Sequence, residues 1–176
     1  MSEAKPEKVK ASTPAGPCPY CSAMVDLGTS SKKKCPSCGE QILSRTDPET
    51  KAKVMVTERG AAELKQKDED LRAINFALKK MGAIGYSEQT IRAKHAELLK
   101  AMPGSKIRDA IWAIAQDEVD SYTRQGEIPH PRVYLAMAAF LEWEGRDGSQ
   151  LKLHAIELWN KLDDMEQEER ERQYLL

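Results

Sequence analysis

The sequence has no long apolar run, and it has no cysteine outside one short segment. No stretch approaches the roughly 20 apolar residues that span a bilayer, and residues 1–16 lack the apolar core of a signal peptide. We therefore expect a cytoplasmic protein with no membrane partner. All four cysteines lie between positions 18 and 38, so disulfide bonds cannot cross-link the rest of the chain.

Groups that enzymes use are also missing. The sequence has no HExxH or GxSxG pattern and no glycine-rich phosphate loop. Its three histidines, His95, His130 and His154, are far apart and have no ligand or nucleophile spacing around them. We expect no enzymatic activity, and no small-molecule substrate is evident.

What the chain does contain is the composition of a globular protein with charged helix surfaces. Hydrophobic residues make up 40% and charged residues 31% of its 176 residues. Residues 1–57 carry nine Lys/Arg and six Asp/Glu, whereas residues 58–176 carry eighteen and twenty-two. The basic end is also the cysteine end. Residues 1–16, rich in Lys, Glu, Pro, Ala and Ser, are predicted to form a flexible tail.

Two Cys-Pro-x-Cys pairs indicate a metal site. They are Cys18/Cys21 and Cys35/Cys38, and the proline in each fixes the turn that lets both sulfurs face one point. Four thiolates can hold zinc or iron, and a single site of this spacing in a small protein is far more often zinc. We expect one structural zinc. Four protein ligands leave no open position for water, so a catalytic role for the metal is not expected.

These residues resemble the zinc-ribbon family, whose CPxCG turns hold one structural zinc between short β-hairpins. The resemblance covers residues 17–57 only, and the helical remainder resembles no family with a role that can be assigned. Gly39 follows the second pair as in the family, whereas Ser22 stands where the first turn usually has glycine. The resemblance implies the metal site and a small β unit, and it specifies no biological role.

Short β segments surround the cysteines. Residues 41–46 and 52–57 alternate in polarity and are predicted to form a hairpin, with residues 47–50 as its turn. Residues 23–27 are predicted to form a short strand, and residues 32–34 a loop before the second cysteine pair. This sheet and its metal make up the predicted ribbon.

From residue 58 the apolar period changes to about 3.5 residues, which predicts a helical domain. Five helices are expected, at about 59–81, 87–102, 105–125, 132–144 and 149–172. The first and fifth helices each have a predicted apolar stripe: Leu64, Leu71, Ile74, Leu78 and Met81 in the first, and Leu151, Ile156, Trp159, Leu162 and Met165 in the fifth. The predicted fold is mainly α, with a tail (1–16), a β zinc ribbon (17–57) and a helical domain (58–176).

Binding is the function class that remains. The leading hypothesis is nucleic-acid binding through the cations of the ribbon and one aromatic ring: Lys32, Lys33, Lys34, Arg45, Lys51, Lys53 and Tyr20. Zinc ribbons are often used in this way, as the resemblance implies. Alternatively, these lysines only solvate a small domain. A different alternative is a protein adaptor, whose acidic helical domain binds a protein partner through Trp112, Tyr134 or Trp143 if these are exposed.

Overall fold

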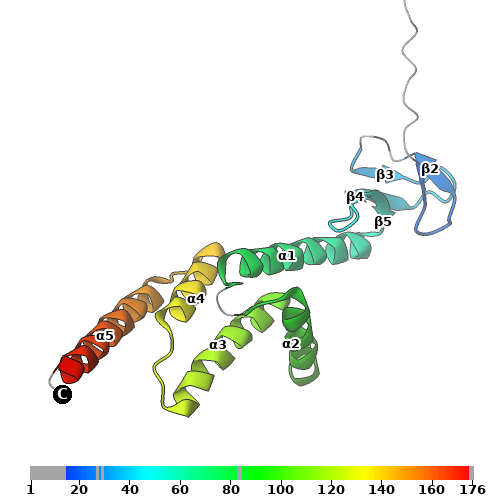
Figure 1. The fold of residues 1–176 in the computed structure, drawn as a ribbon. Coiled ribbons are helices and arrows are strands. Elements are labelled where there is room, and N and C mark those ends of the chain that lie inside the picture. The colour runs from blue at the N-terminus through cyan, green and yellow to red at the C-terminus, as the bar shows by residue number, and fades with distance from the viewer. Residues whose placement is uncertain (1–14, 27, 29, 83–84, 175–176) are drawn as a thin grey trace, which may run out of the picture. The chain divides into compact units, whose positions relative to one another are not determined.

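The computed structural model describes residues 15–26, 28, 30–82 and 85–174, and the side chains up to residue 166. Within these residues, five short strands are followed by five helices, so the predicted fold class is confirmed (Figure 1). Contacts divide the chain into two compact units, Met1–Glu69 and Asp70–Leu176, and the division falls inside the first helix. Most of the predicted tail, residues 1–14, lies outside the described residues.

The strands form two small antiparallel sheets. One pairs β1 with β2 and the other has the order β3-β4-β5. The bounds are β1 Ala15–Pro17, β2 Met24–Asp26, β3 Lys32–Lys34, β4 Gln41–Thr46 and β5 Lys53–Val56. The predicted hairpin, β4 and β5, is therefore present.

Two expectations about this region are wrong. Residues 32–34 form strand β3 instead of a loop, because their backbone pairs with β4, with Lys33 opposite Ile42. Strand pairing uses main-chain groups, and lysine is well suited to the exposed edge of a sheet. In addition, β1 begins at Ala15, inside the predicted tail, because Gly16 pairs with Val25.

Five helices follow. They are α1 Glu58–Lys80, α2 Glu88–Ala101, α3 Ile107–Gln125, α4 Pro131–Trp143 and α5 Ser149–Tyr174. Serine before a helix is a favoured cap, and Ser87 caps α2, since its Oγ accepts a hydrogen bond from the amide of Thr90 at 3.0 Å. The same expectation for Ser105 before α3 is wrong: the cap is Lys106, and the Ser105 hydroxyl instead donates to the carbonyl of Met102. Among the described residues, no helix is long and apolar enough to cross a membrane.

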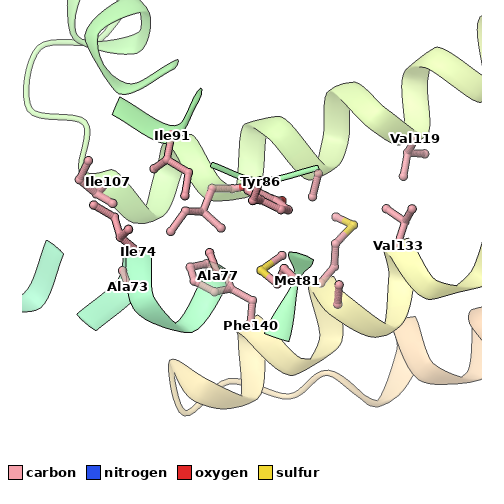
Figure 2. Close-up of a cluster of buried hydrophobic side chains, with 14 residues drawn as sticks. Ala73, Ile74, Ala77, Met81, Tyr86, Ile91, Ile107, Val119, Val133 and Phe140 are labelled. Atoms are coloured by element: carbon pink, nitrogen blue, oxygen red, sulfur yellow. The ribbon is translucent and has the colours of Figure 1, made fainter. Parts of the chain in front are cut away.

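The core of the C-terminal unit joins the end of α1 to α2, α3 and α4 (Figure 2). Ile74 and Ala77 lie on the buried face of α1 and Met81 is buried directly after its end, while Leu78 of the predicted stripe is 38% exposed. The small side chain of Ala77 lets the neighbouring helices approach closely. A sequence pattern of large apolar residues does not predict this position as buried. Inside the core, the hydroxyl of Tyr86 donates to the carbonyl of Ile111 at 2.8 Å, so its polar end is satisfied.

Helices α4 and α5 pack closely through small residues. Ala138 is buried on α4, and a Cβ at Gly148, just before α5, would lie 3.0 Å from its Cα. Among the described side chains of α5, Ala155 is buried, whereas Ile156 and Met165 of the predicted stripe are each 51% exposed and Trp159 is 36% exposed. The predicted stripe of α5 is therefore wrong at these positions.

Candidate metal centre

The two cysteine turns have the same backbone geometry. The amide of Ser22 donates to the carbonyl of Cys18, and the amide of Gly39 donates to that of Cys35, both at 2.9 Å. The first cysteine of each turn also donates its amide to the carbonyl five residues later, at 2.9 and 2.8 Å. Ser22 and Gly39 both have positive φ, 61° and 76°. The serine therefore adopts the left-handed conformation that glycine usually supplies.

This equivalence predicts opposite effects of two substitutions. A non-glycine residue in this conformation costs about 1–2 kcal/mol, so Ser22→Gly should stabilise the N-terminal unit by up to about 1 kcal/mol. Gly39→Ser should destabilise it by about 1 kcal/mol, and since a Cβ there meets no atom within 4 Å, the cost is conformational. Denaturant titration of the metal-loaded protein, followed by amide NMR signals of this unit, measures both. Equal stability of the two variants would contradict the argument.

The four sulfurs converge, as the spacing predicts. The Sγ atoms of Cys18 and Cys38 are 3.9 Å apart, those of Cys21 and Cys35 are 3.7 Å apart, and all four lie within 4.8 Å of one another. These separations are far longer than the roughly 2.05 Å of a disulfide bond. A tetrahedral zinc site with Zn–S bonds of about 2.3 Å has sulfur–sulfur edges of about 3.8 Å. The four cysteines therefore have the arrangement of a closed metal site.

The cysteines also supply much of the core of this unit. Cys18 and Cys35 are each 2% exposed, and among the described residues the buried cluster around them contains Val25, Ile42 and Met55. Val25 comes from β2, Ile42 from β4 and Met55 from β5, so both sheets meet at the sulfurs. Three apolar side chains are a very small core, and a bound metal would supply the missing stabilisation.

Protonation of the sulfurs is uneven. The backbone amide of Cys38 lowers the pKa of the Cys35 thiol to about 6. The amide of Glu40 lowers the pKa of Cys38, but burial and hydrogen bonds with the other sulfurs outweigh it and raise that pKa to about 12. One thiolate therefore forms readily and another resists deprotonation. A divalent cation favours four thiolates, so metal binding would release protons and weaken as the pH falls.

The three lysines of β3 lie on both sides of the sheet. Lys33 lies opposite the buried Ile42 and is half-buried on that side. Residues next to each other in a strand point to opposite faces, so Lys32 and Lys34 lie on the other face, where both are exposed. The structure therefore keeps the lysines on one edge strand without placing their charges at one point.

The remaining predicted contacts are spread around the unit. The Arg45 guanidinium donates from Nη1 to the carbonyls of Ser31 and Ser44, and Lys53 Nζ donates to the carbonyl of Gly28 at 3.4 Å. The Tyr20 side chain, in the first cysteine turn, is 50% exposed.

Arg45 and Lys51 share a hollow with Lys65 of α1, a residue that is not among the predicted contacts. Lys65 lines this hollow because α1 lies next to the hairpin. Helical periodicity in the sequence does not predict that contact.

Comparison of the chain with known protein families, curated proteins and solved structures finds no match.

Proposed function

We propose that this is a non-enzymatic zinc-binding accessory protein that binds nucleic acid through its N-terminal unit. Zinc is the proposed metal because four cysteine sulfurs at tetrahedral separations form a closed site, which suits a structural ion without redox chemistry. Its role is to hold the two sheets, and the surfaces that they present, in place. Recognition is assigned to those surfaces.

Strand β3 carries the proposal. It presents Lys32, Lys33 and Lys34 on the edge of the three-stranded sheet. Within the described part of the chain, no carboxylate forms an ion pair with any of the three. Unpaired lysines that neutralise phosphates release counterions, which is the main source of sequence-independent affinity for nucleic acid. The exposed ring of Tyr20 adds a surface on which a base can stack.

A salt titration tests this function. Binding to a single-stranded oligonucleotide should weaken steeply with salt, and the Lys32/Lys33/Lys34→Ala variant should reduce the slope of log affinity against log salt by about 2. The matched control is Lys79/Lys80/Lys100→Ala, which removes the same charge from helix ends of α1 and α2. Fluorescence anisotropy of a labelled oligonucleotide measures both. Absence of binding at about 50 mM salt would refute the proposal.

A protein adaptor is the second candidate, and exposed apolar residues favour it. Trp143 is 42% exposed, whereas Trp112 and Tyr134 pack against the core and are only partly exposed. On α5, Leu153 and Ile156 are each more than half exposed. Aromatic and large apolar residues often anchor protein interfaces. An adaptor would show no salt-dependent affinity for nucleic acid in the titration above.

A further inference from the structure

A hollow of about 610 Å³ opens on the N-terminal unit. Its walls are the β4–β5 hairpin and the first three turns of α1, and it is lined by Arg45, Thr46, Pro48, Lys51, Ala61, Ala62, Leu64, Lys65 and Asp68. Four of these residues, Pro48, Ala61, Ala62 and Leu64, are small or apolar. Three others, Arg45, Lys51 and Lys65, are cationic. We name the four small or apolar residues the floor of the hollow and the three cations its rim, so the lining combines an apolar and a basic part.

Ion pairs hold the two walls together. Lys67 of α1 pairs with Glu49 at 2.8 Å and with Asp47 at 3.5 Å, and both carboxylates belong to the turn of the hairpin. The Glu49 carboxylate, followed by Asp47, raises the pKa of Lys67. The turn is itself fixed, because Asp47 Oδ1 accepts from the amides of Glu49 and Thr50 at 2.8 and 3.1 Å. These contacts join the hairpin turn to α1 beside the hollow.

The three cations of the rim are available to bind an anionic ligand, because their present contacts neither neutralise their charge fully nor use all their hydrogen-bond donors. Both hydrogen bonds of the Arg45 side chain use Nη1 alone, although a guanidinium has five N–H donors. Lys51 Nζ donates to the carbonyl of Pro48 at 2.6 Å, and a neutral carbonyl leaves its charge uncompensated. Lys65 is 80% exposed and its pairing with Glu69, at 3.9 Å, is weak. Asp68 is the one carboxylate in the lining.

We propose that this hollow seats one nucleotide of a single-stranded nucleic acid. The base or sugar lies on the apolar floor, and the flanking phosphates lie at Arg45, Lys51 and Lys65. A volume of about 610 Å³ is in the range of small-molecule sites, and an apolar floor suits a base that is free to leave a stack. Bases within a duplex are stacked and paired, so a single strand is the better fit. This inference rests on the proposed function and assigns it a contact point.

Two substitutions test the two halves of the site. Lys65→Gln removes one cation of the rim, and Ala62→Leu fills the floor without changing charge. Both residues are exposed on α1, and glutamine and leucine are good helix formers, so both variants should fold. Matched controls lie on α2, where Lys100→Gln and Ala96→Leu make the same changes at exposed positions.

Anisotropy titrations with an oligothymidylate of about 15 nucleotides should show about fivefold weaker binding for Lys65→Gln and about tenfold for Ala62→Leu. Both controls should bind like the wild type. If the wild type binds and Ala62→Leu matches Ala96→Leu, the hollow is not the seat of a base, while the proposed function stands. If the wild type does not bind, the proposed function itself fails. Equal displacement of the oligonucleotide by a poly-glutamate of the same charge would assign the hollow to acidic peptides and overturn the inference.

Discussion

Replacing Cys35 and Cys38 by serine is expected to unfold the N-terminal unit and leave the helices of the C-terminal unit intact. Among the described residues, the buried cluster of this unit contains two cysteines and three apolar side chains, so we expect its folding to depend on a bound metal. Structural zinc contributes about 10 kcal/mol or more of apparent binding free energy in small zinc domains, and that energy is folding energy. Elemental analysis should show one zinc per chain in the wild type and none in the variant. Amide NMR signals of the strands should collapse, while the helical circular dichroism persists.

Two controls make this result specific. Met24→Ser introduces serine at a residue that is 66% exposed, and it should retain both the metal and the strand signals. A chelator added to the wild type should reproduce the effect of the double variant, because both remove the same ion. Iron in place of zinc would contradict the proposed metal. Loss of the helical signal together with the strands would show that the two units do not fold independently.

The metal centre could be predicted from sequence because its chemistry is local. Each pair places two sulfurs on one short turn, and proline limits the conformations of that turn. The structure adds that Ser22 supplies the left-handed residue of the first turn, at a φ of 61°. The sequence marks this position as unusual and does not reveal that the backbone geometry is retained.

Features that depend on pairing between distant segments were not predictable in the same way. Strand β3 forms because its backbone pairs with β4, with Lys33 opposite Ile42. Three consecutive lysines have no polarity pattern that predicts a strand. Similarly, Lys65 joins Arg45 only because Lys67 ties α1 to the hairpin turn. The buried face of α1 uses Ala77 where the pattern of large side chains favours Leu78. Each of these three features is determined by tertiary packing, and local periodicity does not predict it.

Gly148→Ala is expected to destabilise the C-terminal unit strongly. A Cβ at Gly148 would lie 2.6 Å from the carbonyl oxygen of Ala138 and 3.0 Å from its Cα. These are backbone atoms of α4, so no side chain can rotate away, and the chain leading into α5 must move. Overpacking of this kind costs about 3 kcal/mol. For a unit of this size, the melting temperature should fall by about 10–20 °C.

Gly82→Ala is the matched control, because a Cβ there would meet no atom within 4 Å and its φ is not in the left-handed region. It should change the free energy of unfolding by less than about 1 kcal/mol. Urea titration followed by helical circular dichroism measures both variants. If Gly148→Ala is as stable as Gly82→Ala, the close approach of the α4–α5 link to Ala138 is not present in solution. Affinity for an oligonucleotide, measured below the melting temperature of the variant, should be unchanged, because the proposed contacts lie on the N-terminal unit, whose core shares no residue with that of the helices.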